Sequence, residues 1–163
     1  MNRRIAYYGL LVALAFIFSY VESLFPLNFG VPGIKLGLAN LVVIVALYLF
    51  GIKEAIAVSF IRIVLSGLTF GSMAAMVYSL AGGFLSLAVM IIAKRINKLS
   101  TMGVSVLGGV FHNVGQILVA MVVLETVNLI YYLPVLILSG LIAGIIIGIL
   151  AAEIIKRLPE EKI

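Results

Sequence analysis

Six polar or ionisable residues lie inside long apolar segments of the chain, where their side chains are costly to bury. An ionisable group at the centre of a bilayer costs at least about 2.5 kcal/mol on insertion scales, so it normally faces protein or water. An arginine there favours oxyanion binding, because its guanidinium stays charged and donates two parallel hydrogen bonds. We therefore predict a polar site for a small, anionic ligand. Its candidate residues are Glu22, Asn40, Arg62, His112, Asn113 and Gln116.

The composition excludes most other chemistry. The 163 residues contain no aspartate and no cysteine, and His112 is the single histidine. Asp-based Mg²⁺ sites, thiolate catalysis and multi-histidine metal sites are therefore excluded. Neither a phosphate-binding loop nor a nucleophile elbow occurs in the sequence. We expect no catalytic residue, no metal and no cofactor, and ATP-derived energy would have to come from another subunit.

The elements that must position these residues are membrane-spanning helices. Apolar residues make up 64% of the chain, charged residues make up 10%, and the mean hydropathy is +1.33. A water-soluble surface needs more charge than this, and the apolar segments are long enough to cross a bilayer. We predict an all-α, polytopic membrane protein, a six-transmembrane-helix bundle with a single integral membrane domain over residues 1–163. The expected spans are 5–25, 36–50, 55–68, 72–93, 102–127 and 131–155.

The basic residues predict how this bundle lies in the membrane. With six spans both termini share one side, and nine lysine or arginine residues fall on that side, against Lys35 alone on the other. The positive-inside rule then predicts a multi-pass protein of the cell membrane with both termini cytoplasmic. The net charge of +5 follows from this orientation, and no basic stripe predicts nucleic-acid binding. The nine residues are Arg3, Arg4, Lys53, Lys94, Arg95, Lys98, Lys156, Arg157 and Lys162.

The depths of the polar residues predict a cavity that opens to the outside. Arg62 lies nine residues beyond Lys53, which places it about 14 Å into the membrane. His112 is about 15 Å deep, and Gln116 lies one turn further out on the same helix face. Asn40 and Glu22 lie nearer the outer surface, whereas the inner half contains almost no polar residue. Arg62 and His112 are therefore expected near the cavity floor.

Each of these residues also has a structural interpretation, which the sequence leaves open. Asn40 and Asn113 could form interhelical hydrogen bonds, as amide side chains often do in membranes. Arg62 could form a buried ion pair with Glu22. A functional pair and a structural pair look alike in sequence.

Small residues recur at helical spacing in three spans. Such ridges let helix backbones approach closely where lipid provides no hydrophobic driving force. The ridge of the sixth span is predicted to pack inside the molecule, and the shorter ridge of the first span could pack inside or contact a partner. The residues are Gly140, Gly144, Gly148 and Ala152 in the sixth span, Gly82 and Ser86 in the fourth, and Gly9 and Ala13 in the first.

Three motifs give the chain a resemblance to a known family. They are PGIKLGLANL at 32–41, GGVFHNVGQ at 108–116, and Ser139-Gly140 with the later Gly144. With these motifs, the chain resembles the small integral membrane proteins called Gx transporters, often labelled heptaprenyl diphosphate synthase component I. The resemblance covers nearly the whole chain. That family is related in architecture to the substrate-binding S components of energy-coupling factor (ECF) transporters.

The resemblance implies a binding site and a partner. S components are six-helix bundles that bind a vitamin or similar small molecule near the outer face, under the loop joining the first two helices. Here that loop runs from Pro26 to Lys35, and Lys35 joins the candidate binding residues. A small-residue face on the first helix of S components docks onto a transmembrane coupling subunit. Gly9 and Ala13 would be its counterpart in this chain.

Two functional hypotheses follow. The first is the substrate-binding membrane subunit of a small-molecule uptake transporter, working alone or with ECF coupling and ATPase subunits. The second is a non-catalytic membrane accessory subunit of polyprenyl (heptaprenyl) diphosphate synthesis. Chain-elongating prenyl synthases use Asp-rich motifs to hold Mg²⁺. This chain has no aspartate, so we expect it not to be an enzyme. An outward cavity favours the first hypothesis, because isoprenoid diphosphates are made in the cytoplasm.

Overall fold

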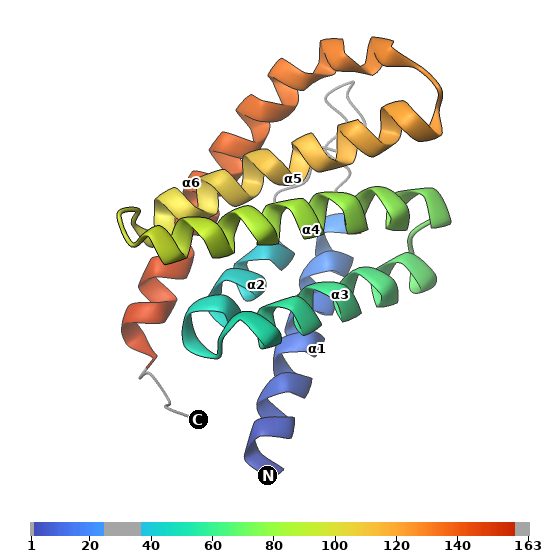
Figure 1. Ribbon diagram of the computed structural model, residues 1–163. Helices are drawn as coiled ribbons and strands as arrows, with labels where there is room; N and C mark the ends of the chain where they lie inside the picture. The colour runs from blue at the N-terminus through green and yellow to red at the C-terminus, as the bar shows by residue number, and fades with distance from the viewer. Residues whose placement is uncertain (1, 25–36, 159–163) are drawn as a thin grey trace.

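The computed structural model describes residues 2–24 and 37–158, which form a bundle of six α-helices without a strand (Figure 1). Four helical segments are long and apolar enough to cross a membrane, and they include α1, α4, α5 and α6. The predicted class, an all-α membrane protein, is confirmed. The helices are α1 (Asn2–Leu24), α2 (Leu38–Leu49), α3 (Ile52–Thr69), α4 (Met73–Ile96), α5 (Thr101–Val123) and α6 (Leu133–Arg157), and the 3₁₀ helix η1 (Val127–Tyr132) precedes α6.

Local sequence signals explain where several helices begin and end. The hydroxyl groups of Ser72 and Ser100 cap α4 and α5 by accepting backbone N–H hydrogen bonds at 3.1 and 3.2 Å. Asn97 ends α4 in the left-handed conformation, with φ of 58°. α5 ends before residue 127, the predicted end of the fifth span, and Glu125 follows it with φ of 48°. Pro134 lies in the first turn of α6, where its missing N–H is not needed.

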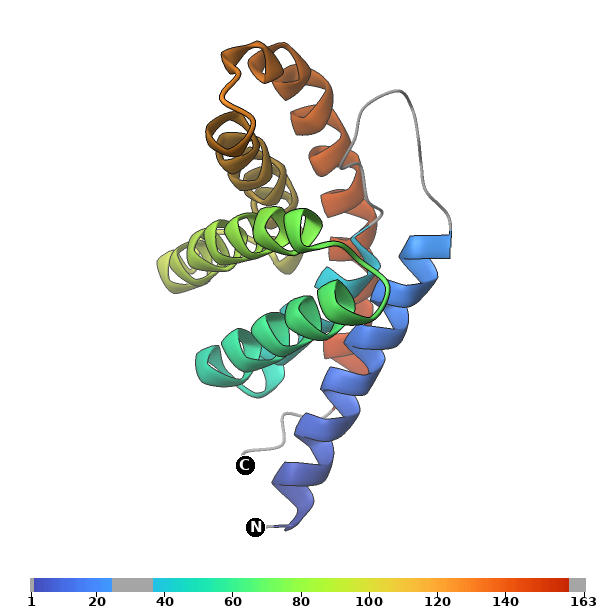
Figure 2. The same cartoon turned by 90° about the vertical axis from the view of Figure 1, so that its right-hand side faces the viewer.

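The helices pack in an open series of neighbours, with α2 joining its two ends. Packing contacts join α3 to α4, α4 to α5 and α5 to α6, while α1 packs on α3 and on α2. α2 also contacts α3 and α6, so it lies between the two halves of the bundle. Figure 2 shows α1 and α6 along one side, with α3, α4 and α5 projecting from the other. Consistent with its central place, α2 is buried along 41–47.

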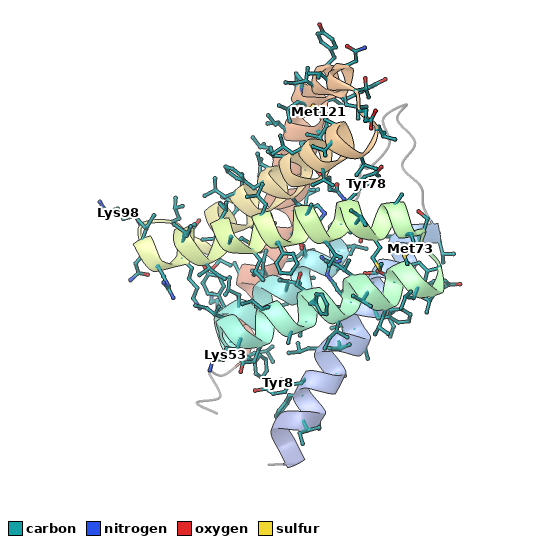
Figure 3. All side chains as sticks on the ribbon, turned by 45° about the vertical axis from the view of Figure 1, so that its right-hand side comes forward. Tyr8, Lys53, Met73, Tyr78, Lys98 and Met121 are labelled. Carbon is teal, nitrogen blue, oxygen red and sulfur yellow. The ribbon has the colours of Figure 1, made fainter. Side chains whose placement is uncertain are left out.

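The bundle has two chemically different ends. The start of α1, the end of α6 and the turns after α2 and α4 lie on one side in Figure 1, and the turns after α3 and α5 lie on the other. We call the first side the charged end, because Lys53, Lys94, Arg95, Lys98, Lys156 and Arg157 lie at it. Figure 3 shows Lys53 and Lys98 at this end and Met73 at the opposite end.

The small-residue ridge of α6 packs against α5 inside the molecule, as predicted. A Cβ atom added to Gly140 would lie 2.7 Å from the carbonyl oxygen of Gly109. One added to Gly144 would lie 2.6 Å from Cα of Val106. Such distances are shorter than an ordinary carbon contact, so the two backbones touch at positions where only glycine fits. In the same way, Gly82 brings α4 close to α5.

Candidate functional site

A polar cavity of about 170 Å³ lies among all six helices, in the half of the bundle opposite the charged end. Its wall combines the last turns of α1, the first turn of α2, the second half of α3, the first turns of α4 and the middle of α5 and α6. Five of the seven predicted binding residues line it, although they are dispersed over 92 positions of sequence. These five are Glu22, Asn40, Arg62, His112 and Asn113.

Arg62 is the central residue of this cavity. Its side chain is only 8% exposed, and its Nη2 donates a hydrogen bond of 3.3 Å to Oδ1 of Asn40. Its Nε is fully buried and has no hydrogen-bond partner among the described residues. A buried guanidinium with unused donors is costly unless an acceptor completes its shell. The arrangement therefore leaves capacity for an oxyanion.

Glu22 does not contact this guanidinium directly among the described residues. Its Oε1 accepts a hydrogen bond of 2.8 Å from the backbone N–H of Leu38, the first residue of α2. Gly37 has no side chain to cap this helix, so a carboxylate from α1 takes that role and meets the positive end of the helix dipole. Among the described residues the ion pair is Arg157 with Glu153, and Glu22 forms none with Arg62. Arg62 and Glu22 therefore form no direct ion pair among the described residues, although Glu22 lies close enough for its charge to act on the guanidinium.

The two asparagines have the interhelical contacts that the structural interpretation proposed. Asn40 links α2 to α3 through Arg62. Asn113 is 7% exposed, and its Nδ2 donates to the carbonyl oxygen of Leu136 at 2.7 Å and to Oγ of Ser139 at 3.2 Å. Asn113 therefore joins α5 to α6, while both asparagines also border the cavity.

One of the described predicted residues, Gln116, lies outside the cavity wall. Its Cγ packs against α4, where a Cβ atom on Gly82 would lie 2.7 Å from it. His112, one turn earlier, approaches Gly82 as well, but it also reaches the cavity wall. Lys35 and the loop predicted to cover the site lie outside the described residues.

The sequence interpretation missed the serine hydroxyl groups of the wall. Ser19 and Ser23 flank Glu22 on one face of α1, and Ser66 lies one turn beyond Arg62 on α3. Each hydroxyl donates to a carbonyl of its own helix, at 3.0, 2.6 and 3.1 Å respectively. A hydroxyl has one hydrogen to donate, so these groups offer only lone pairs to a ligand. A spacing of three residues from Glu22 and of four from Arg62 was the signal that could have identified Ser19 and Ser66, whereas Ser23 directly follows Glu22.

The predicted docking residues lie on an open helix face. α1 is the least buried of the long apolar helices. Gly9 and Ala13 are exposed, and a Cβ atom added to Gly9 would meet no atom within 4 Å. This ridge is therefore free within the described chain, in contrast to the ridge of α6.

Fold and site together define a polytopic helical membrane protein with a buried, arginine-centred polar cavity. The chain belongs to the family described as heptaprenyl diphosphate synthase component I, whose sequence profile matches residues 11–154. This agrees with the resemblance found in the three motifs. Neither a curated protein nor a solved structure shows a significant match to the chain.

Proposed function

We propose that this protein is the substrate-binding membrane subunit of a small-molecule uptake transporter, resembling an ECF S component, and that it is not an enzyme. The observation that carries the proposal is the cavity around Arg62. A ligand pocket typically places a few polar groups in an enclosed site, and here an incompletely satisfied guanidinium lies with two asparagines inside a membrane bundle.

The position of the cavity supports uptake from outside. It lies opposite the charged end, and the positive-inside rule makes the charged end cytoplasmic in a cell membrane. Both termini would then be cytoplasmic, and the cavity would open toward the outer surface. A ligand made in the cytoplasm would have to reach this cavity from the wrong side.

The open ridge on α1 supports a partner in the same membrane. A bundle without an ATP-binding motif cannot use ATP by itself, so ECF-type coupling and ATPase subunits would provide the energy. Gly9 and Ala13 lie in the half of α1 near the charged end, within reach of a subunit that extends from the cytoplasm. Small residues there would allow close helix contact.

A second candidate function follows from a second cavity. An apolar groove of about 350 Å³ lies between α1, α2 and α6 near the charged end, lined by residues such as Leu14, Val45 and Ile154. An isoprenoid chain is chemically suited to such a surface. An accessory role in polyprenyl diphosphate synthesis, which the family description names, would use this groove and leave the Arg62 cavity unused.

One experiment separates the two functions. Protein purified gently from membranes should carry a polar small molecule that native mass spectrometry detects, and Arg62→Gln should abolish its retention. Arg157→Gln is the matched control, because Arg157 is an exposed arginine of the charged end. Retention of an isoprenoid diphosphate that survives Arg62→Gln but is lost on Leu14→Trp, a change at a groove residue that is partly exposed, would favour the accessory role and refute the transporter proposal.

A further inference from the structure

The polar cavity carries information about the charge of its ligand. Among the described residues that line it, Arg62 is the cation and Glu22 is the acid. They form no direct ion pair, although the charge of Glu22 acts on the guanidinium, so each can still contact a ligand group of opposite charge. A ligand with one negative charge and one positive charge would satisfy both groups at once.

The negative group belongs at Arg62. The guanidinium is fixed by its hydrogen bond to Asn40, and its Nε is buried without a described partner. A carboxylate matches the planar fork of a guanidinium and carries a single charge. A phosphate monoester carries about −1.5 to −2 charge at neutral pH, which one arginine would leave partly uncompensated beside Glu22.

The positive group belongs near Glu22, because this side of the wall accepts hydrogen bonds. The Glu22 carboxylate can only accept when ionised. Ser19, Ser23 and Ser66 have each donated their hydroxyl hydrogen to their own helix. A ligand group that donates several hydrogen bonds and carries positive charge fits this set of acceptors, and an ammonium group has three such donors.

The size of the cavity limits the ligand further. Its volume of about 170 Å³ is below the roughly 300–1,000 Å³ that is usual for drug-sized ligands. A long chain cannot be enclosed there. A molecule of a few carbon atoms with both charged groups fits such a cavity more readily than a larger one.

Resting on the proposed function, we infer that the ligand is a small zwitterion with one carboxylate and one ammonium group, such as an α-amino acid or a compound of that size. The carboxylate binds Arg62, and the ammonium group binds Glu22 and the neighbouring serine oxygens. Glu22 thus has two roles, as the cap of α2 and as the cation-binding group.

Three probes of one carbon skeleton test this assignment: L-alanine, L-lactate and propionate, which differ in an ammonium, a hydroxyl or a hydrogen at one carbon. Binding to the purified protein in detergent is measured by calorimetry or by ligand-detected NMR. Alanine should bind at least about tenfold more tightly than propionate, the size expected for a hydrogen bond to a charged group. Equal affinities, or tighter binding of lactate or of inorganic phosphate, would overturn the assignment.

Variants locate the two charges. Arg62→Gln should weaken alanine, lactate and propionate alike by at least about tenfold, because all three share the carboxylate. Arg62→Lys should weaken them less, since it keeps the charge without the fork. Glu22→Gln still caps α2, so it should lower alanine affinity to that of lactate, and it should not weaken propionate, because it removes a negative charge near the bound carboxylate. Circular dichroism and gel filtration establish that each variant is folded, and Glu153→Gln is the control for loss of an exposed acid.

The outcomes distinguish the ligand class from the proposed function. Arg62-dependent binding of a ligand without an ammonium group would overturn the zwitterion and leave the binding function intact. If no probe binds and the protein from membranes carries no polar molecule, both are refuted.

Discussion

A matched pair of glycine-to-alanine substitutions tests the packing that forms this bundle. At Gly144 the new Cβ atom would lie 2.6 Å from Cα of Val106 and 3.0 Å from the carbonyl oxygen of Ser105. Carbon atoms in contact prefer about 3.5–4.0 Å, so α5 and α6 would have to separate by about 1 Å. Both obstructing atoms are backbone atoms that cannot rotate away. At Gly9 the same methyl group would meet nothing within 4 Å.

The two variants isolate the packing energy. Both exchange glycine for alanine in a helix and both gain about 1 kcal/mol of helix propensity, which cancels in the comparison. Overpacking of a close contact costs about 1–3 kcal/mol. Gly144→Ala should therefore unfold more readily than Gly9→Ala by about 1–3 kcal/mol, which corresponds to roughly 2–12 °C in Tm for a chain of this size. Gly9→Ala itself should be neutral or slightly stabilising.

The assay is thermal unfolding in one detergent, followed by circular dichroism, with the unsubstituted protein alongside. Equal shifts in Tm for the two variants would show that α6 does not contact α5 through its glycines. A larger loss for Gly9→Ala would show that the ridge of α1, not that of α6, is the buried one.

Three further predictions follow from the described contacts. A cysteine introduced at Asn128 should react with an impermeant thiol reagent added outside cells, and one at Asn97 should not; the reverse pattern would invert the proposed orientation. Ala13→Leu should leave ligand binding unchanged and abolish co-purification with a coupling module, because the exposed ridge of α1 would no longer allow close approach; transport by the protein alone in liposomes would refute this docking. Asn113→Ala should destabilise the fold by about 1–3 kcal/mol, since it removes two hydrogen bonds between α5 and α6, to the carbonyl oxygen of Leu136 and to Oγ of Ser139, and an unchanged Tm would refute a structural role for these bonds.

The sequence was sufficient for the helices because their signals are local. Apolar length, the serine caps and the basic last turns each act within one segment, and all six predicted spans overlap an observed helix. The cost of a charge in hydrocarbon predicted that Arg62 faces protein or water, and its side chain is buried inside the bundle. Polar residues on different helices could therefore be assigned to one predicted site without knowledge of their contacts.

The contacts themselves could not be predicted in the same way. Arg62 bonds Asn40 at 22 positions of separation, and Glu22 bonds the backbone of Leu38 instead of the arginine, because the rotation of each helix decides which faces meet. Gln116 shares a helix face with His112 and yet packs on Gly82, since a face about 100° wide can border both a cavity and a neighbouring helix. The rotation of each helix about its axis depends on packing across the whole bundle, so it cannot be predicted from a single sequence.

α2 is too short to cross the hydrocarbon core of a membrane. Its 12 residues extend about 18 Å, whereas the hydrocarbon core of a bilayer is about 30 Å thick. The helix can stop inside this layer because protein surrounds it, with Glu22 at one end and Nζ of Lys94 donating to the carbonyl oxygen of Leu47 at 2.7 Å at the other. With the Leu49 end of α2 at one edge of this layer, a ligand held beside Asn40 would lie roughly 14 Å from that edge, about halfway through the layer. The dielectric barrier that remains beneath it is the length of one short helix.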